Sequence, residues 1–241
     1  MRRFFIDPKA VEGQQATLTG GDAHHLQVLR LTAGDQVELF DGRGTVYQAR
    51  IAHIDPGLAR LDLLKAINTP PENLAIHLGQ AMLKGKKMDL VVQKCTELGV
   101  RSLRPYTSQH TKTPPPGTDK LERWQRIIHE SCKQCNQPWP PACHPAQTFH
   151  ELLATAADVD LRLICWEEPD APPLSSIVKQ FSPPDSIMVL IGPEGGFNRD
   201  EIASARQAGF LPVGLGRRIL RAETAAIVII ALLQYIFSDL N

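Results

Sequence analysis

Two short loops near the end of the chain carry residue types that can hold a small ligand. The first reads GPEGGF over residues 192–197, and its glycines permit positive φ angles and a close approach of the backbone to a ligand. The second covers residues 216–224 and carries the charged side chains of Arg218, Arg221 and Glu223. We expect the two loops to form a binding site. Alternatively, the glycines of the first loop serve only as tight turns.

The glycine spacing excludes the common phosphate-binding motifs. Glycines 192, 195 and 196 do not form the G-x-G-x-x-G pattern of dinucleotide sites, and the chain lacks the G-x-x-x-x-G-K-[ST] cradle for a nucleoside triphosphate. A zinc site that uses Cys132, Cys135, Cys143 and His144 is a further alternative. The helical apolar spacing of residues 121–135 favours cysteines that pack as small hydrophobic side chains, so we expect no metal.

Each loop follows a predicted strand. Residues 187–191 form an uninterrupted apolar run, which is typical of a strand buried on both faces of a parallel sheet. Asn198 is expected to begin a helix, with Glu201 in the capping-box position, and a second strand is expected over 210–215. Ligands of open α/β sheets bind outside the carboxyl ends of the strands, so the sequence predicts an active site where the two loops meet.

Strands and helices alternate through the remaining C-terminal part of the chain. The predicted strands cover residues 74–78, 101–106 and 161–165. The predicted helices cover residues 86–98, the segment around Trp124 and the apolar run 225–233. This alternation predicts an α/β domain with an open, mainly parallel sheet covered on both faces.

The N-terminal part has a different pattern. Short strands are expected over residues 3–6, 16–19, 36–40, 46–51 and 59–64, with a hairpin turn at 41–44. They predict a small antiparallel β-barrel. Adjacent prolines within residues 68–73 then predict a linker, because proline neither continues a helix nor donates to a sheet.

Composition and charge limit the class of protein. The chain has 43% hydrophobic and 22% charged residues, and its longest apolar run, 225–233, has nine residues, too few to span a membrane. Five cysteines without an evident secretion signal indicate reduced thiols and a cytoplasmic location. Residues 84–133 hold 11 basic and 5 acidic side chains, whereas residues 151–185 hold 2 and 7. This segregation favours a basic face for nucleic acid, although solvated helix faces would look the same.

Several motifs of the chain resemble one known family. They are GPEGGF at 192–197 and LGRRILRAETA at 215–225, together with MRRFFI at 1–6, DAHHL at 22–26, KGKKMD at 84–89 and KCTELGV at 94–100. The chain resembles the uridine-N3-specific small-subunit ribosomal RNA methyltransferases, known as the ribosomal small subunit methyltransferase E family of the SPOUT superfamily. The resemblance implies a PUA-like RNA-binding β-barrel at 1–68 and a knotted SPOUT methyltransferase domain at 74–241.

The resemblance also implies a cofactor and partners. The deep trefoil knot of the family holds S-adenosylmethionine, and the corresponding residues here are Glu167, Ile191, Gly192, Pro193, Glu194, Gly195, Gly196, Leu215, Gly216, Ile219 and Leu220. The family forms homodimers through the knot region, which would give the apolar helix 225–233 a partner. The other implied partner is ribosomal RNA or the small ribosomal subunit. The residues expected to face RNA are Arg2, Arg3, His25, Arg30, Lys84, Lys87, Arg123 and Arg126.

A mechanistic hypothesis follows for the charged loop. Uridine N3 must lose a proton to attack a methyl group, so negative charge develops on the base, and Arg221 with help from Arg218 is expected to stabilise it. Glu223 is expected to orient an arginine or to accept the proton. The structural alternative is that Arg221 and Glu223 only pair at a helix start.

One segment departs from the family pattern. Residues 136–139 read NQPW where many members carry Gly-Arg, so a basic contact to RNA is missing there.

Two other functions stay open. The chain could methylate a different RNA, or it could be a noncatalytic RNA-binding protein of the same fold.

Overall fold

A computed structural model describes residues 1–168 and 171–238 of the 241-residue chain. Two compact units divide the chain. Unit 1 comprises residues 1–71 together with 129–140, and unit 2 comprises residues 72–128 together with those described from 141 onward. The long helix α3 (Thr118–Cys135) contributes residues to both units.

Unit 1 is a β domain built on one six-stranded sheet with the strand order β1-β4-β5-β6-β3-β2. Its strands are β1 (Arg2–Phe5), β2 (Val11–Glu12), β3 (Gln15–Thr19), β4 (Gln36–Phe40), β5 (Thr45–Asp55) and β6 (Leu58–Asn68). A 3-10 turn, η1 (Pro8–Ala10), and the helix α1 (Gly20–Val28) complete it. All five predicted strands are present, and β5 and β6 are longer than expected because they form one long antiparallel hairpin. The prediction that the strands are all antiparallel is wrong for one pair, since β1 runs parallel to β4.

The core of unit 1 is formed by the apolar residues that alternate along its strands. Phe4, Leu39 and Ile51 are among the fully buried side chains. The predicted hairpin turn is confirmed, since the Asp41 carboxylate accepts the backbone N–H groups of Arg43 and Thr45 at 2.7 and 3.0 Å. Unit 1 is therefore a compact unit with its own core.

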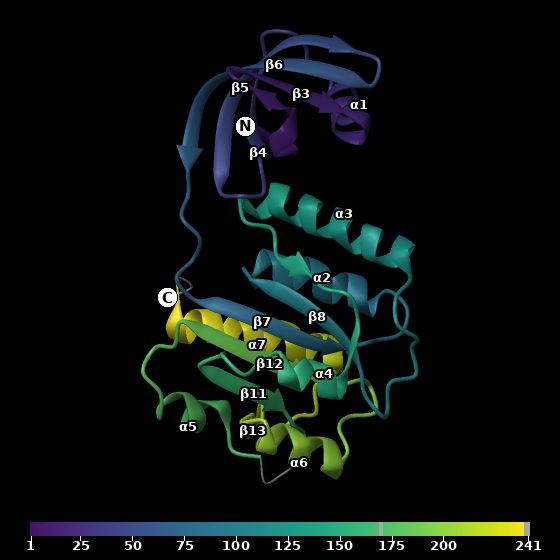
Figure 1. The fold of residues 1–241 in the computed structure, drawn as a ribbon, viewed down its shortest axis with the longest axis vertical. Coiled ribbons are helices and arrows are strands. Elements are labelled where there is room, and N and C mark those ends of the chain that lie inside the picture. The colour runs from purple at the N-terminus through teal and green to yellow at the C-terminus, as the bar shows by residue number, and fades with distance from the viewer. Residues whose placement is uncertain (169–170, 239–241) are drawn as a thin grey trace. The chain divides into compact units, whose positions relative to one another are not determined.

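Unit 2 is an α/β domain whose seven-stranded sheet is parallel throughout. The strand order is β10-β8-β7-β12-β11-β13, with β9 paired to β8 (Figure 1). The strands are β7 (Ala75–Ala81), β8 (Ser102–Thr107), β9 (Ala142–Cys143), β10 (Gln147–Thr148), β11 (Leu161–Cys165), β12 (Ser186–Ile191) and β13 (Leu211–Val213). The apolar run 187–191 forms the central strand β12, with every residue at most 2% exposed, as predicted.

Helices cover both faces of this sheet, which confirms the predicted layers. They are α2 (Lys87–Glu97), α4 (Phe149–Ala154), α5 (Leu174–Val178), α6 (Arg199–Gln207) and α7 (Ala222–Phe237). The helix α7 packs against α2, β7 and β12 on one face. The helices α4 and α6 share one hydrophobic core with Tyr106, Met188 and Leu190 on the other face. Figure 1 shows α4 on the side of the sheet opposite to α7. The expected capping box starts α6, because Asn198 and Glu201 exchange hydrogen bonds of 2.8 and 3.0 Å.

None of the helices in the described residues combines the length and hydropathy that a membrane span needs. Among the same residues, no three His, Cys, Asp or Glu side chains come together as a group that could hold a metal ion. Burial raises the pKa of the Cys95 and Cys132 thiols to about 12. Both groups therefore stay protonated at neutral pH.

Candidate functional site

A cavity of about 850 Å³ lies at the carboxyl ends of β11, β12 and β13, beside the start of α7. This is the edge of the sheet where the sequence predicts the active site. The cavity is lined by Lys87, residues 165–168, Ala171, Pro173, residues 191–194, Gly196, residues 213–222 and Ala225.

The first loop leaves β12 in a conformation that glycine makes possible. Gly196 has a φ of +68°, and a Cβ at Gly192 would lie 3.1 Å from the Phe197 ring. The start of the loop is fixed by the fully buried Tyr106, whose hydroxyl donates to the Ile191 carbonyl at 2.9 Å. Residues 192–194 and Gly196 of this loop line the cavity.

The second loop, 214–221, holds its charges at the surface. Arg217, Arg218 and Arg221 are exposed, and they form no ion pair or side-chain hydrogen bond within the described residues. Ile219 is 82% exposed, although it is a large apolar residue. A third segment lies beside the second loop. The backbone N–H of Trp166 donates to the Val213 carbonyl at 3.0 Å, which places residues 166–168 beside the end of β13.

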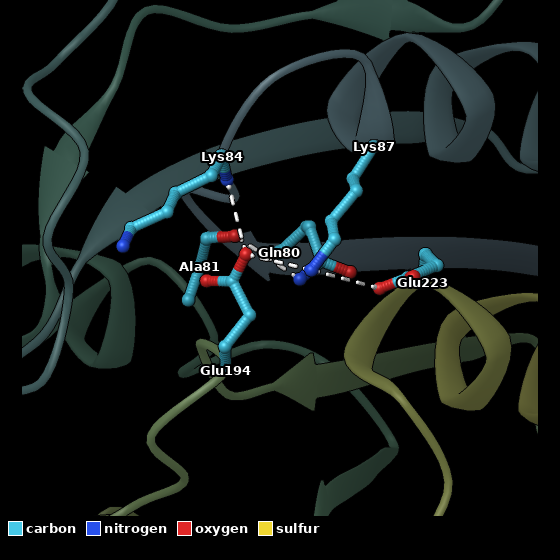
Figure 2. A network of polar contacts seen from close by, with 6 residues as sticks. All are labelled: Gln80, Ala81, Lys84, Lys87, Glu194 and Glu223. Carbon is cyan, nitrogen blue, oxygen red and sulfur yellow. Dashed lines mark hydrogen bonds and ion pairs between the residues drawn. The ribbon is translucent and has the colours of Figure 1, made fainter.

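A polar network connects the first loop to the starts of α2 and α7. Figure 2 shows the Lys87 ammonium between two carboxylates, 3.0 Å from Glu194 Oε1 and 3.9 Å from Glu223 Oε2. The Lys84 backbone N–H also donates to Glu194 Oε1, at 3.1 Å. Nearby, the buried Gln80 side chain donates to the Ala81 carbonyl at 3.1 Å. The network therefore ties together segments that are far apart in the sequence.

The electrostatics of the two glutamates differ. Burial raises the pKa of Glu194, but hydrogen bonds from the Lys84 N–H and the Lys87 ammonium outweigh burial, so the pKa of this carboxyl lies below its ordinary value of 4.5. Glu223 is buried, and its Oε2 atom accepts no hydrogen bond. A buried acceptor without a donor is unfavourable, and it marks a place where a ligand could supply the missing N–H.

The structure brings most of the predicted cofactor-binding residues together. All of them line the cavity except Gly195, whose carbonyl instead accepts from His110 Nδ1 at 3.0 Å. Arg218 and Arg221 also line it, whereas Glu223 does not: its Oε2 lies 3.9 Å from the Nζ of Lys87, which does line the cavity. Arg221 and Glu223 form no ion pair with each other, so the simple helix-start pair is wrong. The roles assigned to these residues stay predictions.

The predicted RNA-facing residues divide into two groups. Arg2 and Arg30 in unit 1, and Lys84 and Arg126 in unit 2, are exposed.

The other predicted RNA-facing side chains have contacts within their own unit. Arg3 pairs with Glu38 at 3.0 Å and Arg123 pairs with Asp89 at 2.7 Å, while the His25 ring lies edge-on to Phe4. Lys87, as described above, is held in the carboxylate network.

Sequence reasoning missed several cavity residues. Trp166, Glu168 and Arg217 line the cavity although they were assigned no role, and Lys87 lies in it rather than among surface lysines. A signal for Lys87 was present, because a lysine at the first position of a helix opposes the helix dipole and so calls for a special reason.

Comparison with known proteins agrees with this geometry. The family model described as an RNA methyltransferase domain matches residues 70–234, and the one described as an RNA methyltransferase PUA domain matches residues 18–64. Ribosomal RNA small subunit methyltransferase E from a Synechocystis species is 36% identical, over 95% of this chain and 76% of the relative. The protein of the same name from Buchnera aphidicola is 32% identical, over 98% and 94%.

Solved structures extend the comparison to the fold. Ribosomal RNA small subunit methyltransferase E from Neisseria gonorrhoeae, bound to S-adenosylmethionine, superposes with a TM-score of 0.91 at 32% identity, over the full length of both chains. A methyltransferase from Legionella pneumophila in complex with the same cofactor gives a TM-score of 0.90 at 30% identity, over 99% of this chain and 98% of the other. The chain therefore belongs to the ribosomal RNA small subunit methyltransferase E family.

Proposed function

We propose that this chain binds S-adenosylmethionine in the cavity at the ends of β11, β12 and β13 and methylates N3 of a uridine in small-subunit ribosomal RNA. One observation carries the proposal: the two loops that resemble the cofactor loops of the family meet around one cavity. The Neisseria relative, which matches over its whole length, is bound to this cofactor. We place the reaction in the cytoplasm.

The cavity suits a methyl donor of this size and chemistry. Its volume of about 850 Å³ lies within the range of ordinary ligand pockets, about 300–1,000 Å³. Trp166, Ile191 and Leu220 offer apolar surface for the adenine of the methyl donor. The backbones of residues 192–196 and 215–220 offer polar groups. The acidic side chains of Glu167 and Glu194 suit the positive charge of a sulfonium.

When bound, S-adenosylmethionine supplies an electrophilic methyl carbon, whose bond to sulfur breaks with both electrons remaining on sulfur as the new N3–C bond forms. In our proposal Glu223 accepts the N3 proton on Oε2, the oxygen that otherwise has no hydrogen-bond donor. Arg221 and Arg218 stabilise the negative charge that spreads over the base oxygens, because their guanidinium groups make no ion pair or hydrogen bond with residues 1–168 or 171–238. These residues position the base and its proton, and no covalent enzyme intermediate is needed.

The finer features of the fold belong to the same proposal. We infer a trefoil knot through the two cofactor loops, and domain limits of 1–68 and 74–241, from the similarity to the family. We also infer a homodimer formed through α7. Its outer surface supports this, since Tyr235 is 59% exposed and Leu232 and Ile236 are more than a third exposed. A monomer rarely leaves such a group of apolar side chains uncovered.

RNA is proposed to bind through the exposed basic side chains. Arg2 and Arg30 on unit 1, and Lys84 and Arg126 on unit 2, have no carboxylate partner within the described residues. They are therefore available to phosphates, which orient the RNA without reading its bases. Arg3 and Arg123 would have to exchange their present partners, so we expect them to contribute less.

The test combines one variant with a comparison of two RNA substrates. Arg221→Ala should leave binding of S-adenosylmethionine close to wild type by calorimetry and lower methyl transfer about 10²–10³-fold, because one stabilising donor is lost. Ribosomal subunits and transfer RNA are compared as substrates, and the modified base is mapped by mass spectrometry. Unchanged turnover would refute the role of Arg221. Methylation of transfer RNA in place of ribosomal subunits would show that the substrate is a different RNA. Failure of the wild-type protein to bind the methyl donor would indicate a noncatalytic RNA-binding protein.

A further inference from the structure

Lys87 occupies a position that local helix chemistry disfavours. It is the first residue of α2, where the helix dipole repels a positive charge, and the preceding N-cap residue, Lys86, makes no capping hydrogen bond through its side chain. Acidic or small polar residues normally start a helix. The reason for a lysine here must therefore come from outside the helix.

Two carboxylates from other elements supply that reason. The Lys87 ammonium lies 3.0 Å from Glu194, in the loop after β12, and 3.9 Å from Glu223, in the first turn of α7 (Figure 2). The side chain is 35% exposed and lines the cavity. Glu194 is held at the same time by the Lys84 backbone N–H. Lys87 thus connects the first loop to the first turn of α7, which directly follows the second loop.

Glu223 depends on this bridge. Its side chain is 10% exposed, and its Oε2 atom accepts no hydrogen bond although a cation lies 3.9 Å away. At that distance the ammonium attracts the carboxylate without using its lone pairs. The oxygen is therefore held in place, covered from solvent, with a lone pair that no donor among the described residues uses.

We propose that Lys87 is a positioning residue for methyl transfer: it fixes the first loop through Glu194 and holds the Glu223 carboxylate where the base presents its N3–H. This inference rests on the proposed function. It assigns Lys87 to the reaction centre, in place of the phosphate contact expected from its neighbours in the sequence.

Lys87→Met and Lys87→Arg test the proposal, with Lys94→Met as the matched control. Lys94 lies on the same helix, is 39% exposed and pairs with Glu97 at 2.8 Å, but it is not part of the cavity. Lys87→Met should lower kcat about 10²-fold, the effect of a misplaced reacting group. Lys87→Arg, which keeps the charge, should recover part of that loss. Lys94→Met should keep wild-type kcat.

Binding measurements separate positioning from RNA contact. Lys87→Met should still bind S-adenosylmethionine in calorimetry, because the Lys84 backbone N–H continues to hold Glu194 in the first loop. Its RNA affinity should keep the wild-type dependence on salt. A lost phosphate contact would instead lower the slope of log K against log salt by about 0.7–0.9 and leave kcat at saturating RNA unchanged. That result would overturn the proposal, and so would a variant that no longer binds the methyl donor.

The variant Glu223→Gln distinguishes this inference from the proposed function. It should lower kcat about 10²–10⁴-fold, and adding Lys87→Met to it should cause little further loss, because both changes remove one function. If Glu223→Gln loses turnover while Lys87→Met keeps it, the role of Lys87 is wrong and the proposed proton route stands. If Glu223→Gln keeps wild-type turnover, the proton route itself is wrong. Fully multiplicative losses would show that Lys87 does not act through Glu223.

Discussion

The hydrogen bond beneath the first loop gives a prediction whose size follows from the structure. Tyr106 lies near the carboxyl end of β8, is fully buried, and donates through its hydroxyl to the Ile191 carbonyl at 2.9 Å. Ile191 is the last residue of β12 and the first to line the cavity from that strand. Tyr106→Phe removes this donor and keeps the ring, which packs against Phe149 at a centroid distance of 5.8 Å.

The expected loss combines two terms. A typical internal hydrogen bond contributes about 1 kcal/mol to the free energy of unfolding, and a buried acceptor deprived of a donor costs about 1–3 kcal/mol. No cavity forms, because only the hydroxyl is removed. We therefore expect Tyr106→Phe to lower the free energy of unfolding by about 2–4 kcal/mol. It should also weaken binding of S-adenosylmethionine, because the start of the loop is less firmly held.

Urea denaturation, followed by tryptophan fluorescence, measures the change in the free energy of unfolding. Tyr47→Phe is the matched control, since the half-buried Tyr47 hydroxyl makes no hydrogen bond within the described residues. The control should change the free energy of unfolding by less than about 0.5 kcal/mol. If Tyr106→Phe loses no more than this control, or if methyl-donor affinity is unaltered, the loop is not anchored as described.

Three further predictions concern RNA binding, assembly and the first loop. The double variant Lys84→Ala, Arg126→Ala should reduce the slope of log K for RNA against log salt by about 1.4–1.8, and an unchanged slope in filter binding would contradict the basic surface. If the proposed homodimer forms through α7, Tyr235→Glu should convert it to a monomer in sedimentation, because a charge would be buried at the interface; a persistent dimer would place the interface elsewhere. Gly196→Ala should weaken methyl-donor binding in calorimetry at least tenfold, since φ is +68° and the new methyl would collide with the Glu167 carboxylate. Gly117→Ala, which has open space around it, is the control and should bind normally.

Local patterns in the sequence predicted much of the fold. The apolar run 187–191 and the capping box of Asn198 with Glu201 depend on neighbouring residues, and both are confirmed in β12 and α6. The division of the chain into two units could not be predicted as well from the sequence. Residues 129–140 belong to unit 1 because His129 stacks on Phe5 with ring centroids 4.1 Å apart, a contact that no local pattern of α3 reveals.

The part of the candidate site that depends on glycine positions and on strand ends could be predicted from the sequence. Gly192 and Gly196 mark a loop that a ligand can approach, and the carboxyl ends of parallel strands meet at one edge of a sheet, so residues from both loops line one cavity. Lys87 could not be placed in this way. It lies among surface-like lysines in the sequence, and its partner Glu194 is 107 residues away along the chain. Long-range ion pairs of this kind appear only once the fold is known.

The central claim is that the loops after β12 and β13 enclose one methyl donor. A crystal structure of this protein with S-adenosylmethionine tests it directly. The cofactor should lie in the cavity, in contact with the backbone of residues 192–196 and of residues 215–220, with the Arg221 side chain and the Glu223 carboxylate on the side open to RNA. Cofactor density outside this cavity, or contacts to only one of the two loops, would contradict the account.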